Sequence, residues 1–335
     1  MEHILVYGLF VLGLILIVKG GDWFVDSAIW IAEVTGIPAI IIGATIVSIA
    51  TTLPELMVSV TASLQGSSEM AIGNAIGSII CNIGLISSLA FITINNEINR
   101  KLFGKKSAIM IATLITFTVF SFDLLFSHLE SVIVLLFIIL FLYYNIKGSN
   151  DDKEEYTVDK IKITSESITK NIILFVIGAA GIVIGAALLV DNGIIIANLL
   201  GVSEAIISLT VIALGTSLPE LTTMLSSIKK KNHDIGLGNI IGANILNVAL
   251  ILTTTSLISK DGLPIRLYDF ELFGMKFNKF ASTLKIDVPF ALLLMVIFAV
   301  PTVIYKKTKR WQGILMLIIY FVYLVFRVST GVGVL

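Results

Sequence analysis

The sequence predicts an all-α membrane protein whose ten transmembrane helices form two inverted-topology repeats of five helices each. Three observations support this prediction. Hydrophobic residues make up 56% of the 335 residues and charged residues 14%, whereas soluble globular proteins carry about 25% charged residues. Apolar runs long enough to cross a bilayer recur along the chain, and its second half repeats motifs of the first half.

Each apolar run holds at least the roughly 17 residues that a transmembrane helix needs, and the first and sixth runs are long. The runs cover residues 4–30, 39–64, 70–93, 107–125, 130–146, 171–197, 204–228, 235–258, 288–305 and 312–330. A short turn near Ser127 and His128 separates the fourth run from the fifth. The first run lacks a basic leader and a small-residue cleavage site, so we expect a retained helix rather than a signal peptide.

The lysines and arginines predict the orientation of the helices, because short cytoplasmic loops hold an excess of these residues. With the N-terminus outside, the inside loops hold basic clusters at Arg100 to Lys106, Lys147 to Lys170, Lys229 to Lys231 and Lys306 to Arg310. The exception is the outside stretch from Lys260 to Lys285, which is long and also carries acidic residues, and long segments obey the rule less well. We therefore expect a multi-pass protein of the cell membrane with both termini outside and with cytoplasmic loops after helices 1, 3, 5, 7 and 9. The 23 basic and 23 acidic residues balance, so no net positive field favours nucleic acid as a partner.

A charged segment divides the chain near its middle. Residues 1–146 are expected to form the first five-helix repeat, 147–170 a cytoplasmic linker, and 171–335 the second repeat. An extramembrane insert at about 260–287 mixes aromatic and charged residues. This insert either lies along the membrane surface or forms a plain loop.

The repeat is visible at an offset of 165 residues, the spacing from Glu55 to Glu220. At this offset "TIVSIATTLPEL" aligns with "TVIALGTSLPEL", and "IGNAIGSIICNIGLI" aligns with "LGNIIGANILNVALI". Because each half holds an odd number of helices, the second half must enter the membrane in the opposite orientation. Inverted repeats of this kind are typical of secondary transporters, whose ion sites lie near the bilayer midplane.

The second helix of each half carries a helix break and a carboxylate. Pro54 and Pro219 have no N–H to donate to the carbonyl groups four residues earlier, so backbone oxygen is freed there. Glu55 and Glu220 lie near the bilayer centre, where an ionisable residue is by default functional. The second and third runs of each half contain no lysine or arginine to pair with them.

Hydroxyl and amide groups accompany the two carboxylates. Thr51 and Thr52 share a helical face with Glu55, and Thr216 and Ser217 relate to Glu220 in the same way. The third helices add Ser78, Asn82 and Asn247, together with Gly73, Gly77, Gly238 and Gly242. The glycines serve either close helix packing or a deviating backbone. An all-oxygen set of this kind suits a hard cation such as Ca²⁺ or Na⁺.

These motifs resemble those of the cation/calcium exchanger superfamily, in particular the prokaryotic sodium/calcium exchangers. The resemblance rests on "GATIVSIATTLPEL", "GNAIGSIICN", "ALGTSLPEL" and "GNIIGAN", and it covers nearly the whole chain. It implies a secondary active antiporter, not an enzyme, that exchanges about three Na⁺ for one Ca²⁺ by alternating access. It also implies a monomer in the lipid bilayer, with no cofactor besides the transported ions, in which the first and sixth helices slide across a rigid core.

The resemblance also implies a set of ion ligands. It assigns ion contacts to Glu55, Glu220, Thr51, Thr52, Ser78, Asn82, Thr216, Ser217 and Asn247, and to backbone carbonyl groups near Ser48 and Ala213.

Two positions depart from the family pattern. Asn247 stands where some relatives, the potassium-dependent exchangers among them, carry an aspartate. This argues against a K⁺ requirement and leaves two carboxylates, which neutralise one Ca²⁺ but not three Na⁺. Ala243 replaces a serine expected opposite Ser78, so one Na⁺ site lacks a hydroxyl group.

Other transport functions on this fold remain open. In proton/calcium exchangers the motif in the third helix of each half resembles "GNxxE", but in this chain Gly77 and Gly242 occupy the glutamate positions. A buried glutamate can nevertheless exchange protons. A cation channel is a weaker alternative, because channels usually assemble around symmetric rings of ligands. An intramembrane enzyme that uses the two carboxylates lacks an accompanying nucleophile or metal motif.

Overall fold

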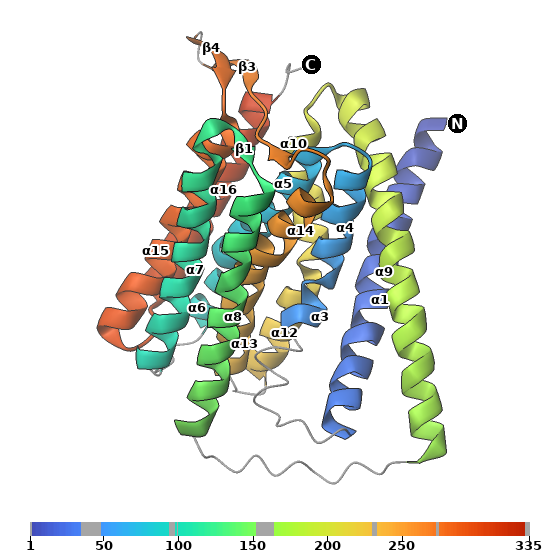
Figure 1. Cartoon of the computed structure of the whole chain (residues 1–335), viewed down its shortest axis with the longest axis vertical. Helices are drawn as coiled ribbons and strands as arrows, with labels where there is room; N and C mark the ends of the chain where they lie inside the picture. Colours follow the sequence, from blue (N-terminus) through green and yellow to red (C-terminus); the bar gives the residue numbers. More distant parts are fainter. Residues whose placement is uncertain are drawn as a thin grey trace.

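The computed structural model describes residues 2–34, 48–93, 98, 100–151, 164–229, 233–272 and 275–331 (Figure 1). Within these residues, nine helices are long and apolar enough to cross a membrane, and the shorter apolar helix Leu53–Leu64 belongs to the predicted second span. The predicted start of that span, residues 39–47, lies outside the described residues. The all-α membrane architecture is thereby confirmed.

The elements of the first half are α1 (Glu2–Val34), α3 (Ser48–Thr51), α4 (Leu53–Leu64), α5 (Ser68–Cys81), the π-helix η2 (Asn82–Ser87), α6 (Ser88–Thr93), α7 (Arg100–Phe120), the 3-10 turn η3 (Ser121–Asp123), β1 (Leu125–Phe126) and α8 (His128–Asp151).

The elements of the second half are α9 (Ser165–Leu200), α10 (Glu204–Ile207), the π-helix η4 (Ser208–Ile212), α11 (Ala213–Thr216), α12 (Leu218–Lys229), α13 (His233–Leu246), the π-helix η5 (Asn247–Leu252), α14 (Thr253–Ile258), β2 (Leu263–Pro264), β3 (Tyr268–Leu272), β4 (Met275–Phe280), the π-helix η6 (Thr283–Asp287), α15 (Val288–Tyr305) and α16 (Arg310–Gly331).

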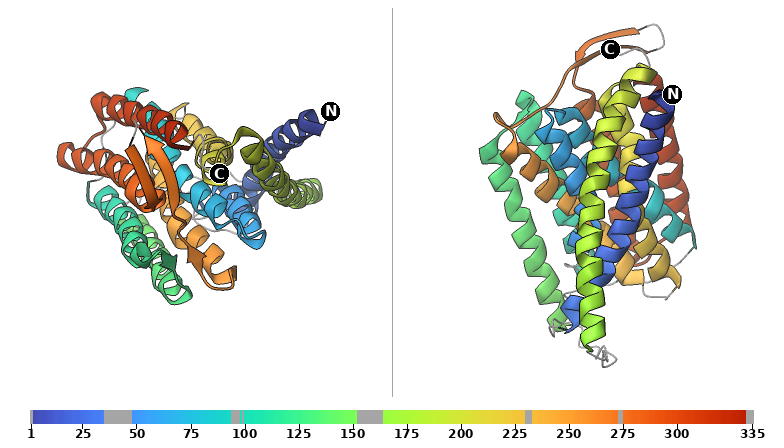
Figure 2. Two further views of the ribbon diagram at one scale, coloured as in Figure 1. Left: turned by 90° about the horizontal axis from the view of Figure 1, so that it is seen from above. Right: turned by 90° about the vertical axis from the view of Figure 1, so that its right-hand side faces the viewer.

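The two longest helices, α1 and α9, lie side by side and run in opposite directions (Figures 1 and 2). Glycines allow their backbones to touch. A Cβ atom on Gly13 would lie 2.9 Å from the carbonyl oxygen of Gly185, and one on Gly178 would lie 2.7 Å from that of Gly20. At the repeat offset, Gly13 aligns with Gly178 and Gly20 aligns with Gly185. The two contacts are therefore equivalent, with the first and second halves of the chain exchanged. This pairing agrees with the predicted inversion.

The spans Ser68–Thr93 and Gly236–Ile258 are the most buried of the nine. They carry α5, η2 and α6 in the first half and α13, η5 and α14 in the second half. The other helices surround them and present apolar side chains outward. The third helix of each repeat therefore forms the centre of the bundle, which is where the candidate site lies.

The insert at about 260–287 contains a β-hairpin, so the expectation of a plain loop is wrong, and its position relative to the membrane surface stays a prediction. Residues of β3 and β4 pair antiparallel, with Tyr268 opposite Phe280 and Leu272 opposite Met275. The segment "YDFEL" alternates apolar and polar residues with the period of a strand, "MKFNKF" does so as far as Asn278, and both contain aromatic residues, which favours pairing. A second short pairing, of β1 with β2, ties the start of the insert to the turn before α8.

The hairpin lies at the end of the bundle where α1 begins and α16 ends (Figure 1). The start of α1 and the end of α16 thus share one end of the molecule, as the even number of predicted helices requires. Which side of the membrane this end faces remains a prediction.

Candidate cation-binding site

Both "LPEL" motifs interrupt a helix. Helix α3 ends at Thr51 and α4 begins at Leu53, while α11 ends at Thr216 and α12 begins at Leu218. Thr52, at the first break, has φ −79° and ψ −5°, a conformation sparsely populated outside turns. The breaks precede Pro54 and Pro219 by two residues, as expected for a ring that crowds the preceding turn. The predicted helix breaks are therefore confirmed.

The two glutamates lie in the first turns of the helices that follow the breaks, where the helix dipole favours negative charge. Glu55 and Glu220 are each 1% exposed. The Ser217 hydroxyl donates to Oε1 of Glu55 at 3.2 Å, so the two motifs meet across the repeats. The ion pairs found among the described residues involve other acids, and no described basic side chain pairs with either glutamate. The site thus holds two buried carboxylates without a positive partner from the described chain.

All eleven residues predicted to line the site are at most 1% exposed: Ser48, Thr51, Thr52, Glu55, Ser78, Asn82, Ala213, Thr216, Ser217, Glu220 and Asn247. Several of their oxygen atoms form no hydrogen bond with the described part of the chain. These atoms are Thr52 Oγ1, Glu55 Oε2, Ser78 Oγ, Asn82 Oδ1, both carboxylate oxygens of Glu220, and Asn247 Oδ1. Each such atom costs about 1–3 kcal/mol, and more for a charged group. A cation held by these oxygens would remove that cost.

The third helix of each repeat changes its winding at an asparagine of the site. The π-helix η2 begins at Asn82, and η5 begins at Asn247. π-Helical turns are rare and occur frequently at functional sites, because the wider turn redirects side chains. Asn82 and Asn247 are equivalent at the repeat offset, so both halves contain the same irregularity at the same place. The sequence offers no local signal for it.

Three buried asparagines beside the site were not among the residues predicted from the sequence. Asn74 Nδ2 donates to the Glu55 carbonyl at 3.0 Å, and the Thr216 hydroxyl donates to Asn74 Oδ1 at 3.2 Å. Asn239, its equivalent in the second repeat, accepts from the Thr51 hydroxyl at 3.4 Å. Both asparagines belong to the "GN" dipeptides of the aligned motifs, so the alignment of the two repeats could have identified them.

Asn244 is the third missed residue. Its Oδ1 accepts from Asn82 Nδ2 at 3.3 Å, which places an amide group next to Ala243. Asn244 aligns with Ile79 at the repeat offset, so a search for matched polar pairs does not find it.

Three of the four glycines allow close packing around the site, and a Cβ atom on Gly73 would lie 3.0 Å from the Ser208 Cβ. A Cβ atom on Gly77 would lie 2.8 Å from the Leu209 Cα, and one on Gly242 would lie 2.6 Å from the Ser48 hydroxyl oxygen. A Cβ atom on Gly238 would meet no atom of the described residues within 4 Å. Gly77 and Gly242 hold the positions of the glutamates in the "GNxxE" pattern, and a side chain there would displace its neighbours.

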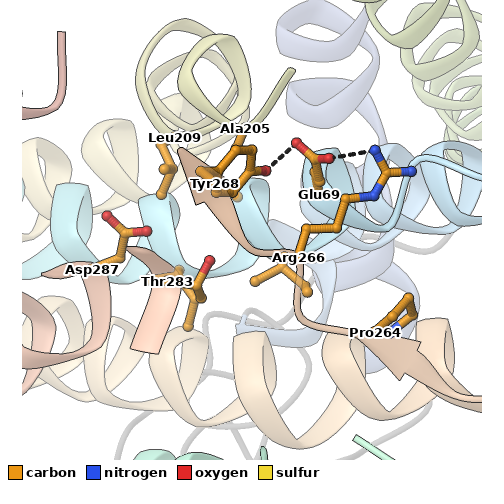
Figure 3. A pocket seen from close by; sticks show the side chains of 11 residues that line it. Glu69, Ala205, Leu209, Pro264, Arg266, Tyr268, Thr283 and Asp287 are labelled. Carbon is orange, nitrogen blue, oxygen red and sulfur yellow. Dashed lines mark hydrogen bonds and ion pairs between the residues drawn. The ribbon is translucent and has the colours of Figure 1, made fainter. Parts of the chain in front are cut away.

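The helices of the site meet the insert at a small enclosed pocket between α5, α10, η4 and the insert (Figure 3). Arg266 Nη1 pairs with Glu69 Oε1 at 2.7 Å, and the Tyr268 hydroxyl donates to the other oxygen of that carboxylate. Burial, together with the Glu69 charge, raises the pKa of Tyr268. The insert is thus anchored to the first turn of α5, the helix that carries Ser78.

A family model described as sodium/calcium exchanger protein matches residues 5–147 and 170–329. The chain belongs to the sodium/calcium exchanger family. Members of this family are membrane transporters rather than enzymes, and the resemblance found in the motifs is confirmed.

Individual relatives of this exchanger-family chain match it over almost its full length. An uncharacterized membrane protein of Methanocaldococcus jannaschii is 36% identical over 320 residues, which cover 95% of this chain and 97% of the relative. Sodium/calcium exchanger MaX1 of Methanosarcina acetivorans is 30% identical over 351 residues, 94% of this chain and 96% of the relative. A structure of the sodium-calcium exchanger NCX_Mj soaked with 2.5 mM Na⁺ and 10 mM Sr²⁺ matches with a TM-score of 0.65 and 33% identity, covering 96% of this chain and 99% of that one.

Proposed function

We propose that this family member exchanges Na⁺ for Ca²⁺ across the cell membrane. The observation that carries the proposal is the set of unpaired buried oxygen atoms around Glu55 and Glu220. Carboxylate, hydroxyl and amide oxygens are the ligands that Ca²⁺ and Na⁺ prefer, and the described residues contain no group of three or more His, Cys, Asp and Glu side chains that would suit a transition metal.

We assign the ion contacts to the eleven residues of the predicted set, with Ser48 and Ala213 contributing their backbone carbonyl groups. Glu55 and Glu220 neutralise one Ca²⁺. Sodium ions compete for the same oxygens, and three of them would exceed the two negative charges of the site. An exchange of about three Na⁺ for one Ca²⁺ would therefore move net charge across the membrane.

Alternating access is proposed to come from α1 and α9 moving together against the other helices. Their glycine-lined contact makes them one packed unit. A Cβ atom on Gly21 of α1 would lie 3.6 Å from the Pro219 ring and 3.9 Å from the Pro54 ring, so α1 passes directly over both helix breaks. A shift of the pair would thus change access to the site. We propose that a monomer suffices, with both termini outside.

The test is Ca²⁺ uptake into proteoliposomes of the purified full-length protein, with the Na⁺, K⁺ and H⁺ gradients varied separately. We expect an outward Na⁺ gradient to drive uptake, an imposed membrane potential to change its rate, and K⁺ to have no effect. Uptake driven by a pH gradient and indifferent to Na⁺ would instead identify a proton/calcium exchanger. Flux that persists without any counter-ion would identify a channel.

A further inference from the structure

The asparagines Asn74 and Asn239 contact the site across the boundary between the repeats. Asn74 lies on α5 of the first half and accepts from Thr216 of the second half at 3.2 Å. Asn239 lies on α13 of the second half and accepts from Thr51 of the first half at 3.4 Å. Both asparagines are at most 1% exposed. The contact is therefore made twice: in each case an asparagine of one repeat accepts a hydrogen bond from a threonine of the other repeat.

Each threonine hydroxyl has a second acceptor at nearly the same distance. Thr51 Oγ1 lies 3.3 Å from the Ser48 carbonyl oxygen, and Thr216 Oγ1 lies 3.3 Å from the Ala213 carbonyl oxygen. Bonding to a carbonyl group three or four residues earlier is the usual choice of a threonine in a helix. A hydroxyl group has one proton, so the asparagine and the carbonyl group compete for it.

The two carbonyl groups in this competition are those assigned to the cation. Each already accepts one backbone N–H, from Thr52 to Ser48 at 3.1 Å and from Ser217 to Ala213 at 3.1 Å. A carbonyl oxygen has two lone pairs, so one remains for either the threonine proton or the cation. When the asparagine takes the proton, this lone pair and the lone pairs of the threonine hydroxyl are both free to face the cation.

We propose that Asn74 and Asn239 are positioning residues that set the Ca²⁺ affinity without contacting the ion. Each draws the threonine proton of the opposite repeat away from a ligand carbonyl group. Without the asparagine, the threonine hydroxyl turns back to its own helix and occupies the carbonyl oxygen that the ion needs. This inference rests on the proposed function, because it takes the Ser48 and Ala213 carbonyl groups as ligands.

The side chains of Asn74 and Asn239 differ in their other hydrogen bonds, and this difference decides which asparagine is tested first. Asn74 Nδ2 also donates to the Glu55 carbonyl and to Ser59 Oγ, both at 3.0 Å. Met224 stands at the position equivalent to Ser59, and Asn239 Nδ2 finds no acceptor within the part of the chain that the structure describes. Among the described residues, the Asn239 side chain thus accepts hydrogen bonds from the hydroxyl groups of Ser48 and Thr51. Replacing it leaves the backbone of Glu55 untouched.

The experiment is a crossed set of double variants with Ca²⁺ affinity as the readout, measured by titration calorimetry on the purified full-length protein. Asn239→Ala should weaken Ca²⁺ binding about five-fold, the value of one ordinary hydrogen bond. In a Thr51→Val background the same change should cost less than about two-fold, because no hydroxyl remains to turn back. In a Thr216→Val background, Asn239→Ala should again weaken Ca²⁺ binding by the full factor of about five. The reason is that the wild-type Thr216 hydroxyl contacts Asn74 and not Asn239.

A structural role alone would lower the melting temperature and weaken binding by the same factor in both threonine backgrounds, and that result would overturn the inference. So would an unchanged Ca²⁺ affinity in Asn239→Ala. If that variant does not fold, Asn239→Leu and the mirror set built on Asn74→Ala apply the same comparison. A wild-type protein that binds no Ca²⁺ contradicts the proposed function itself, which distinguishes the two failures.

Discussion

Glu55 and Glu220 share their burial but differ in their hydrogen bonds. Glu55 accepts from the Ser217 hydroxyl, whereas neither carboxylate oxygen of Glu220 has a hydrogen-bond partner among the described residues. Thr52, the equivalent of Ser217, likewise keeps its hydroxyl group without such a partner. The second carboxylate therefore depends more strongly on a bound cation than the first.

Replacing Glu220 with Gln should raise the melting temperature in cation-free buffer, because a buried charge is removed. The same variant should lose the stabilisation that Ca²⁺ gives the wild type, which is about 2.7 kcal/mol at a Ca²⁺ concentration 100 times the Kd. Thermal unfolding in detergent, with and without Ca²⁺, measures both effects.

Glu69→Gln is the matched control for this prediction. Glu69 is also an acid near a helix start, but it pairs with Arg266 outside the site. The Glu69→Gln protein should keep its Ca²⁺-induced stabilisation. A Glu220→Gln protein that Ca²⁺ stabilises as well as the wild type would contradict the assignment of Glu220 as a ligand.

At the scale of the elements, α13 contains two glycines that differ in their contacts with the described residues. Gly242→Ala should destabilise the protein by about 1–3 kcal/mol, because the new methyl group would meet Ser48 Oγ at 2.6 Å and the Phe141 ring at 3.0 Å. Gly238→Ala should be neutral or stabilising by up to about 1 kcal/mol, because alanine favours a helix and no atom of the described residues lies within 4 Å of the new methyl group. Thermal unfolding of both variants tests this, and equal losses would contradict the close approach at Gly242.

A second element-scale prediction concerns the proline inside α15. Pro301 has no N–H for the Ile297 carbonyl, and Gln312 Nε2 of α16 donates to that oxygen instead at 2.8 Å. Gln312→Leu should therefore cost about 1–3 kcal/mol of stability.

The matched background for this prediction is Pro301→Ala, which restores the backbone donor within α15. In that background Gln312→Leu should lower the stability distinctly less than in the wild type. Thermal unfolding of the wild type, the two single variants and the double variant measures the difference. An equal cost with and without Pro301 would mean that Gln312 acts in another way.

The sequence predicted these elements unevenly. Prolines marked both helix breaks, because the missing N–H is a property of a single residue. The π-helices at Asn82 and Asn247 could not be predicted, since their winding depends on packing in the centre of the bundle. The β3–β4 hairpin was missed because five or six residues give too short an alternation to outweigh the mixed composition of the insert.

At the scale of the whole molecule, the repeat explains most of what the sequence predicted correctly. The glutamates and the residues that line the site were found as aligned pairs. Contacts between unrelated segments were not found. The buried ion pair between Arg327 of α16 and Asp287 of η6, at 3.0 Å, joins residues that share no motif.

The membrane orientation is the prediction that belongs to this scale. In a background without Cys81, Asp261→Cys in the insert should react with a membrane-impermeant maleimide in intact cells. Lys229→Cys, at the end of α12, should react only after the membrane is opened. Both native side chains are exposed, so accessibility to reagent is set by the membrane. Labelling of the two positions in the reverse order would invert the predicted topology.

The central claim is that Glu55 and Glu220 hold Ca²⁺ in a site for which Na⁺ competes. The most direct measurement is calorimetric titration of Ca²⁺ into the purified protein at increasing Na⁺ concentration, with Glu55→Gln and Glu220→Gln beside the wild type. We predict one Ca²⁺ per chain, an apparent Kd that rises steeply with Na⁺, and a loss of at least about 100-fold in each variant, as expected for a buried charged ligand. Ca²⁺ binding that is indifferent to Na⁺, or that survives in both variants, would contradict the account.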